Sequence, residues 1–151
     1  MDTKPVTEHR RTLGALLRLP YEAMQREVYG ALAARGFPEI RPAHSAVFRH
    51  IAPGGSRLTV LAERAGMTKQ SMAYLVEGLQ EAGLLRSLPD PSDGRARIVR
   101  LTARGQAALD TLLALSAEAE ARVADRIGDK RAAKLRRALE HWVMALEQEA
   151  G

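Results

Sequence analysis

Two short helical patterns separated by one glycine constrain the fold of this chain more than any other feature. They lie between Thr59 and Gly83, on either side of Gly66, which can adopt the left-handed conformation that ends a helix. We expect Thr59 to cap the first helix and Thr68 the second. The second helix places four apolar residues at i, i+3, i+4 and i+7, and these must be buried: Met72, Leu75, Val76 and Leu79. So short a turn sets the helices at a steep angle, and the second then projects its opposite face outward.

The outward face of the second helix is polar near its N-terminus. With the capping residue it comprises Thr68, Lys69, Gln70, Ser71 and Tyr74. Such a helix end can offer backbone N–H groups to phosphate and side chains to base edges. Gln70 and Ser71 are the better candidates for base edges, whereas Lys69 suits phosphate because an ammonium group is a point charge on a flexible stem. The alternative is an ordinary solvated helix face.

A predicted β-hairpin follows the two helices. Residues 85–88 and 97–101 have the pattern of strands, and Asp93-Gly94 is a strong signal for a turn between them. Arg95 and Arg97 lie beside that turn. A hairpin tipped with arginine is suited to a minor groove, where narrow A·T tracts concentrate negative potential. For Arg95 the alternative is a mobile loop charge, and strand alternation can aim Arg97 either at phosphate or at solvent.

Together these segments resemble the helix-turn-helix and wing of the MarR family of bacterial transcriptional regulators. The resemblance is carried by LAERAGMTKQSMAYLVEGLQEAGLL and by DPSDGRARIVRLTARG. Its most specific part is a D-x-R-x-x-x-x-x-L-T pattern formed by Asp93, Arg95, Leu101 and Thr102. The match extends to the flanking helices and so covers nearly the whole chain. It implies that Arg95 enters a minor groove and that Asp93 orients the wing or pairs with an arginine.

The segment before the helix-turn-helix is predicted to be helical. Residues 7–35 follow a helical pattern that Pro20 interrupts, so they form either one bent helix or two helices broken at Pro20. Residues 42–52 are expected to form another helix, with Pro42 in its first turn. Residues 56–58 can form a short strand that pairs with the wing.

Two more helices are predicted after the wing. Thr102 should cap a helix that runs to about Ile127, and Asp129 should cap a last helix over residues 130–148. In the last helix the apolar residues step by 4, 3 and 4, as in a coiled-coil seam: Leu135, Leu139, Trp142 and Leu146. The outer helices are longer than a winged helix-turn-helix core can cover, so they need each other or a second subunit.

These expectations define one fold class: mainly helical, with a small β-hairpin wing, and with a winged helix-turn-helix between long N- and C-terminal helices. We expect all 151 residues to form a single domain. Within it, residues 42–101 form the DNA-binding lobe. The resemblance implies that the outer helices, at about 7–35 and 102–149, interlock to form a homodimer. Two recognition helices about one helical turn apart would then read an inverted repeat of two half-sites.

The charge of the chain agrees with a polyanionic partner. The net charge is +5 and the isoelectric point is about 10.1. Residues 57–104 carry a net charge of +3, whereas residues 105–151 carry −1, so the C-terminal helices are not where a polyanion should bind. Arg57 and Arg64 are further candidates for backbone phosphates, whereas Arg86, Arg100 and Arg104 are expected to be solvated or to contribute general electrostatics.

The main hypothesis is therefore a sequence-specific DNA-binding transcriptional regulator, in this family most often a repressor. The resemblance also implies a small aromatic or anionic effector, bound between the dimerisation helices and the DNA-binding lobe. Arg18, His44 or His50 can pair with its carboxylate, an assignment that rests on location and not on a matched motif. The alternative hypothesis is a winged-helix module that binds a protein or a small molecule without specific DNA binding.

Several other classes of protein are excluded or disfavoured. The chain has no cysteine, which rules out disulfides, thiolate metal sites and cysteine redox chemistry. The four histidines lack the spacing of a metal site, and we expect no metal or cofactor. No nucleophile elbow, phosphate loop or suitably placed carboxylate pair suggests an enzyme, so we expect no catalytic residues. With no apolar run of about 20 residues and no signal core, the protein should be cytoplasmic and free of the membrane.

Overall fold

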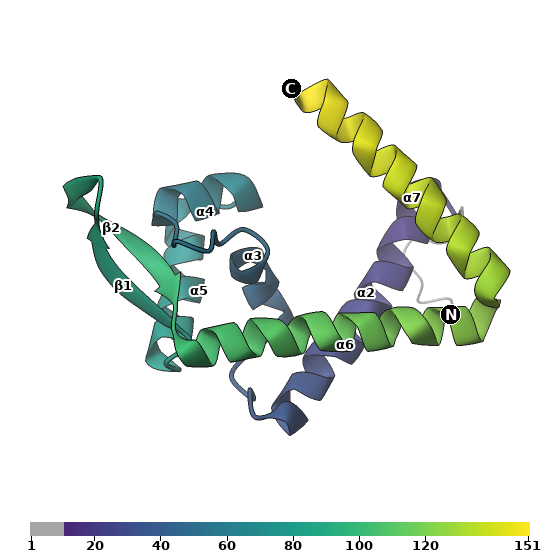
Figure 1. The fold of residues 1–151 in the computed structure, drawn as a ribbon, viewed down its shortest axis with the longest axis horizontal. Helices are drawn as coiled ribbons and strands as arrows, with labels where there is room; N and C mark the ends of the chain where they lie inside the picture. The colour runs from purple at the N-terminus through teal and green to yellow at the C-terminus, as the bar shows by residue number, and fades with distance from the viewer. Residues whose placement is uncertain (1–10) are drawn as a thin grey trace, which may run out of the picture. The chain divides into compact units, whose positions relative to one another are not determined.

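The computed structural model describes residues 11–151. They belong to two compact units, of which the first ends at Ala114 and the second is Leu115–Gly151. The described residues are mainly helical and contain one two-stranded antiparallel hairpin, which confirms the predicted fold class (Figure 1). The prediction that the whole chain is one domain stays a prediction.

Helix α2, Leu13–Leu32, is continuous through Pro20. The alternative of two helices broken at Pro20 is therefore wrong. The start expected at about Thr7 lies outside the described residues. Thr12 caps α2 and its hydroxyl accepts a hydrogen bond from the backbone N–H of Ala15 at 3.3 Å. The chain continues through the short 3₁₀ helix η1, Ala33–Arg35, and then turns at Gly36, where φ is +94°. The helical region thus ends where the sequence predicted.

The next helix is shorter than expected. It consists of the 3₁₀ turn η2, Pro42–His44, and helix α3, Ser45–Phe48, whereas the sequence predicted residues 42–52. The backbone N–H of Ala52 donates to the hydroxyl of Ser56 at 3.0 Å instead of to a helical carbonyl. This side-chain acceptor offers the backbone an alternative to the helix, and the segment turns toward the hairpin.

The helix-turn-helix consists of α4, Leu58–Ala65, and α5, Lys69–Glu81. Thr59 is not the cap of α4, because the last extended residue is Arg57 and its carbonyl already accepts the N–H of Leu61. Gly66 adopts the left-handed conformation (φ +63°) that ends α4, as predicted. Thr68 caps α5 as predicted, since its hydroxyl accepts the N–H of Ser71 at 3.1 Å.

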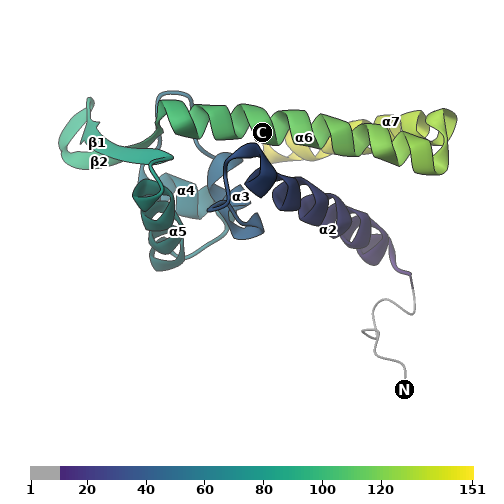
Figure 2. The same ribbon diagram turned by 90° about the horizontal axis from the view of Figure 1, so that it is seen from below.

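The core of the first unit is built around α5. This helix packs against α3, α4 and β1, the first strand of the hairpin (Leu85–Asp90), and Figure 2 shows these elements grouped together. Its four predicted core residues are buried, each at most 6% exposed: Met72, Leu75, Val76 and Leu79. The opposite side of α5 is thereby left on the surface.

The hairpin pairs β1 with β2, Asp93–Leu101. Its turn is Pro91-Ser92, so the prediction of a turn at Asp93-Gly94 is wrong. The reason is a local side-chain acceptor, because Asp90 Oδ1 accepts the backbone N–H of Ser92 at 2.8 Å and its hydroxyl at 2.7 Å. This arrangement, in which an aspartate mimics a backbone turn, lets Asp90 pair directly with Asp93.

The strand expected at residues 56–58 is a single bridge. Ser56 exchanges two backbone hydrogen bonds with Val99 of β2, at 2.9 and 2.8 Å, whereas Leu58 already belongs to α4. The expected pairing with the wing is thus confirmed over one residue. Gly55 makes this approach possible, because a Cβ atom there would lie 2.8 Å from the carbonyl oxygen of Val99.

Helix α6, Ala103–Ile127, begins in the first unit. Thr102 caps it as predicted: its oxygen accepts the N–H of Gly105 at 3.0 Å and its hydroxyl donates to the carbonyl of Gly83 at 2.6 Å. A Cβ atom at Gly105 would lie 1.9 Å from the carbonyl oxygen of Leu84, so no other residue fits at that position. The end of α5 and the start of α6 are therefore closely joined.

Arg104 is partly exposed, but it also makes specific contacts that the sequence did not predict. Its guanidinium donates to the carbonyl of Ala82 at 2.6 Å and to the carboxylate of Glu39 at 2.9 Å, and it lies 5.4 Å from the ring centroid of Phe37. A guanidinium can satisfy all three because it is planar, charged and rich in donors. Arg104 thus fastens the loop after α2 to the junction of α5 and α6.

Helix α7, Asp129–Ala150, belongs to the second unit. Its N-cap is Gly128, with φ +86°, and Asp129 is its first residue, so the predicted cap at Asp129 is displaced by one position. Within this unit Arg136 pairs with Glu120 and, at 2.8 Å, with Glu140. None of the helices over residues 11–151 combines the length and the hydropathy that a membrane span requires.

Candidate nucleic-acid interface

The polar residues predicted at the start of α5 lie on the surface. Lys69, Gln70 and Ser71 are exposed, and the Tyr74 side chain is 67% exposed. Their common orientation follows from the burial of the opposite face of α5. Thr68 also donates its hydroxyl hydrogen to Ser71 Oγ at 2.8 Å, so these two hydroxyls orient each other at the helix end.

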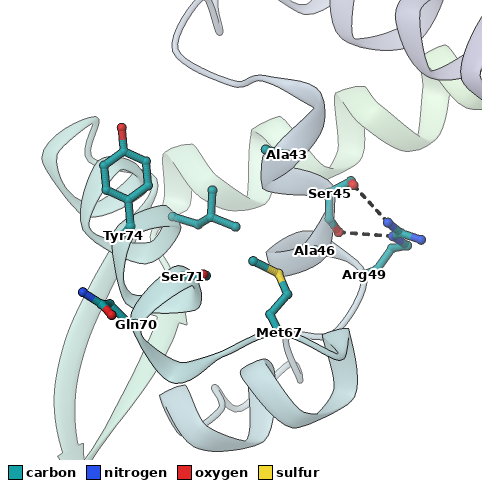
Figure 3. Close-up of a pocket in the computed structure, with 9 residues that line it drawn as sticks. Ala43, Ser45, Ala46, Arg49, Met67, Gln70, Ser71 and Tyr74 are labelled. Atoms are coloured by element: carbon teal, nitrogen blue, oxygen red, sulfur yellow. Dashed lines mark hydrogen bonds between the residues drawn. The ribbon is translucent and has the colours of Figure 1, made fainter.

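A hollow of about 580 Å³ lies along one side of this face. Gln70, Ser71 and Tyr74 of α5 line it together with residues of η2 and α3, as Figure 3 shows. Arg49 lies at its opposite wall, where its guanidinium donates to the carbonyl of Ser45 at 3.3 Å and to its hydroxyl at 3.0 Å. The sequence reasoning missed Arg49, because the helix expected over residues 42–52 gave no reason to place it beside α5.

Arg95 and Asp93 lie at the start of β2, next to the turn of the wing. Both are exposed. Asp93 Oδ1 accepts the backbone N–H of Arg95 at 3.1 Å, and within residues 11–151 the guanidinium of Arg95 has no hydrogen-bond or ion-pair partner. Asp93 therefore orders the backbone that carries Arg95, and the charged Arg95 side chain is exposed on the surface of the wing.

Arg97 is held against the other strand. Its Nε donates to Ser87 Oγ at 2.9 Å and a terminal nitrogen donates to the Ser87 carbonyl at 3.0 Å. A smaller hollow, of about 190 Å³, lies between the wing and α5 and is lined in part by Arg97, Ala73 and Glu77. The charge of Arg97 thus lies on the wing side of α5, and two of its donors are occupied within the hairpin.

Asp90 and Arg57 form an ion pair that the sequence reasoning did not foresee. The Nε of Arg57 donates to Asp90 Oδ2 at 2.7 Å, and the Asp90 residue is only 8% exposed. Hydrogen bonds from Ser92, and then from Arg57, lower the pKa of Asp90 to about 2. The Asp-Pro-Ser sequence is a turn signal that would have identified Asp90, whereas its partner 33 residues earlier has no local signature.

Arg57 and Arg64 were considered as phosphate contacts. Arg57 is engaged by Asp90, and Arg64 donates to the carbonyl of His50 at 3.2 Å. Both arginines thus have partners within the lobe.

The three candidate effector residues come from separate segments. Arg18 of α2 forms an ion pair with Glu22 at 3.1 Å. His44 of η2 is 4% exposed, and its Nδ1 accepts the backbone N–H of Arg41 at 2.9 Å. Burial, and then the charge of Arg41, lower the pKa of His44. His50 is half-buried in the loop after α3. A neutral, buried imidazole suits a structural role at His44 better than a pair with a carboxylate.

The described part of the chain contains no group of three histidine, aspartate or glutamate side chains that could hold a metal ion. The surface around α5 is instead a set of amide, hydroxyl, phenol and guanidinium groups, which are the donors and acceptors that read base edges and phosphates.

The sequence was also compared with known protein families. Residues 40–96 match the sequence pattern of the MarR family. No curated protein matches the sequence.

Solved structures match over most of the chain. A MarR family protein from Mycobacterium tuberculosis in complex with salicylic acid is 29% identical, with 87% of this chain and 96% of that chain covered and a TM-score of 0.65. The transcriptional repressor CouR of Rhodococcus jostii RHA1, bound to a 23-mer DNA duplex, is 23% identical, with coverages of 94% and 99% and a TM-score of 0.68. Wild-type MarR of Escherichia coli without ligand is 19% identical, with coverages of 86% and 96% and a TM-score of 0.70.

Proposed function

We propose that the chain is a DNA-binding transcriptional regulator of the MarR family that acts as a homodimer, since residues 40–96 match the sequence pattern of that family. One observation carries the proposal: a polar, exposed helix N-terminus and a wing whose Arg95 has no side-chain partner among the described residues project from the same lobe. Such a lobe can place α5 in a major groove and Arg95 in the neighbouring minor groove.

We assign the contacts by the chemistry of each side chain. Gln70 and Ser71 suit base edges, whereas Lys69, Arg97 and the capped N-terminus at Thr68 suit phosphates. Tyr74, at 67% exposure, can add a contact one turn further along the helix. Asp93 acts through the backbone of Arg95 and not by touching the polyanion itself. CouR, which has the same fold, is bound to a DNA duplex in its solved structure, and this supports the assignment.

The homodimer is proposed from the second unit. Along one side of α7, large apolar side chains that a folded protein normally covers are 36–51% exposed: Leu135, Leu139, Trp142, Val143 and Leu146. A continuous apolar face of this kind marks a site of protein association. A second copy would cover it, with the helices at about 7–35 and 102–149 as the dimerisation region and residues 42–101 as the DNA-binding lobe. Two lobes related by a two-fold axis then require an operator with inverted half-sites.

Repression, with release by a small aromatic or anionic effector, completes the proposal. An M. tuberculosis family member was solved with salicylic acid, and CouR was also solved with p-coumaroyl-CoA, which supports a ligand of this class. Arg18 and His50 remain the residues to test, since His44 is buried and its pKa is lowered. An effector releases DNA only to the extent that it binds the non-binding dimer geometry more tightly than the binding one.

Selection of bound duplexes from a random pool, followed by titration of the selected duplex at two salt concentrations, tests the proposal. We expect an enriched inverted repeat with half-sites about 10 bp apart and a specificity ratio of at least ~1000. Weak binding that vanishes at moderate salt, with no enriched motif, would overturn it. That result would favour a winged-helix module for a protein or small-molecule partner.

A further inference from the structure

The wing is attached to the start of α4 at two places. At its base, Ser56 and Val99 exchange two backbone hydrogen bonds of 2.9 and 2.8 Å. Near its turn, the next residue, Arg57, donates through Nε to Asp90 at 2.7 Å, and a terminal nitrogen lies 3.7 Å from Asp93 Oδ2. A two-stranded hairpin alone is marginally stable in water, so attachments of this kind decide where its turn points.

Asp90 is the centre of the second attachment. Both carboxylate oxygens are in use, since Oδ1 accepts two hydrogen bonds from Ser92 and Oδ2 accepts one from Arg57. The residue is 8% exposed and its donors lower the carboxyl pKa to about 2, so it is ionised throughout the physiological range. A nearly buried carboxylate that is fully occupied by neighbours of its own chain is placed to define geometry and not to meet a ligand.

The contacts around Asp90 and Arg57 extend through Asp93 to Arg95, the arginine assigned to the minor groove. Asp93 lies opposite Asp90 in the strand register, approaches Arg57 through Oδ2, and accepts the backbone N–H of Arg95 through Oδ1 at 3.1 Å. Arg57 in turn is the last residue before α4, which packs on α5. The backbone of Arg95 is thereby connected, through the two polar contacts of Asp93, to Arg57 at the start of the helix that supports α5.

We propose that Arg57 and Asp90 are positioning residues that hold the wing at a set distance from α5, so that Arg95 and the start of α5 engage DNA together. The inference rests on the proposed function. Contacts ordered before binding spare the complex the entropy of ordering them, and that saving appears as affinity. Arg57 thus serves binding through the wing and not as a phosphate contact.

Because Asp90 is negatively charged, its substitution distinguishes a positioning role from a general electrostatic effect on DNA binding. Replacing Asp90 with asparagine removes one negative charge from a surface that faces a polyanion, and it also frees Arg57 for phosphate. Both effects would tighten DNA binding and steepen its salt dependence. A positioning role predicts the opposite, because an amide has one acceptor oxygen where the carboxylate uses two.

The first experiment measures the affinity of Asp90→Asn for the selected duplex by fluorescence anisotropy, with Asp110→Asn as the matched control. Asp110 is an exposed aspartate on α6 whose Oδ1 accepts a hydrogen bond from the Gln106 side chain at 2.9 Å. We expect Asp90→Asn to weaken binding about tenfold and Asp110→Asn to leave it unchanged or slightly tighter. In an Arg95→Ala background, Asp90→Asn should have no further effect, because the group it positions is gone. Binding by Asp90→Asn as tight as wild type, or an undiminished loss in the Arg95→Ala background, overturns the proposal.

Hydrogen exchange of the free full-length protein is the second measurement. Asp90→Asn should speed the exchange of the Ser92 and Arg95 amides and leave the buried amides of α5 unchanged, which also verifies that the variant folds. Unchanged exchange at the wing would overturn the positioning role. If the wild-type protein selects no DNA, the proposed function fails while exchange still tests the attachment. If the wild type binds and Asp90→Asn binds equally well, only the positioning role fails.

Discussion

Helices α5 and α7 have nearly the same spacing of apolar residues, but these residues are buried in α5 and exposed in α7. Met72, Leu75, Val76 and Leu79 of α5 are at most 6% exposed, because α3, α4 and β1 cover them. Leu135, Leu139, Trp142 and Leu146 of α7 are 36–51% exposed, and α7 has no buried residue. Periodicity thus predicts which face of a helix is apolar, but not whether the same chain supplies the cover. The apolar face of α5 is covered within one chain, whereas that of α7 is exposed and is the face that the proposed second copy would cover.

Leu79→Ala should have the largest effect on the lobe. Leu79 is fully buried, so truncation leaves a cavity and should lower the free energy of unfolding by about 2–5 kcal/mol. Chemical denaturation checks this value at several protein concentrations. The loss should not depend on concentration if the lobe is complete in one chain, whereas the loss caused by Leu139→Ala should depend on it, as expected of a dimer contact. A loss that depends on concentration for Leu79→Ala but not for Leu139→Ala would show that the lobe, and not α7, relies on a second copy.

Leu139→Asp should separate the two copies. A charge in the middle of an apolar interface should weaken association by about 2 kcal/mol or more, which is over tenfold in the dissociation constant. Sedimentation velocity measures the shift to monomer. Arg137→Asp, on the opposite face of α7, is the control and should leave the dimer intact. A wild-type protein that sediments as a monomer at all concentrations would show that α7 is covered by something other than a second copy.

Arg95→Ala should weaken operator binding by about 1–3 kcal/mol and flatten the preference for A·T-rich flanks, because a minor-groove arginine responds to groove width. Arg95→Ala should leave the oligomeric state unchanged, in contrast to Leu139→Asp. Arg100→Ala removes an equal charge from an exposed position on the same strand and is the matched control. Titration of both variants against duplexes with A·T-rich and G·C-rich flanks decides the assignment. Equal effects at both positions would reduce Arg95 to a general charge.

Thr68→Ala should cost about 1 kcal/mol of unfolding free energy, since it removes the acceptor for the Ser71 N–H at the start of α5. Thr68→Ser retains that oxygen and should recover most of the loss. Thermal unfolding followed by circular dichroism measures both variants. If Thr68→Ala were as stable as wild type while binding DNA less tightly, the hydroxyl would serve the ligand and not the helix.

These outcomes bear on how much could be predicted from the sequence. The helix-turn-helix was predictable because its signals are local: the left-handed Gly66, the Thr68 cap and the spacing of the α5 core. The caps at Thr59 and Asp129 were each assigned to a residue inside the helix, since adjacent residues compete for the same role. The turn was misplaced by two residues, because Asp-Gly is a stronger general signal than the Asp90 side chain that closes the turn.

The contacts that organise the candidate site were not predictable. Arg57 meets Asp90 across 33 positions, and Arg104 meets Glu39 across 65. Neither pair has a periodic or local signature, because the fold alone brings the partners together. The exposed faces of α5 and the wing, in contrast, follow from which residues the core requires. Sequence reasoning therefore found the residues that point away from the protein more readily than those that position them.

His44 is the subject of the prediction with the smallest expected effect, a change in how the stability of the lobe depends on pH. Burial, and then the charge of Arg41, lower its pKa below the ordinary value, so the folded lobe favours the neutral imidazole that accepts the Arg41 N–H. The stability this contributes is fully present above the unfolded pKa of about 6.5 and declines as pH falls below it. His44→Asn keeps an acceptor without a titrating group and should reduce the stability lost between pH 7.5 and 5.5 in chemical denaturation. His141→Asn, at an exposed position on α7, should leave that loss in place. Equal losses in wild type and His44→Asn would show that the lobe does not depend on the neutral form of this histidine.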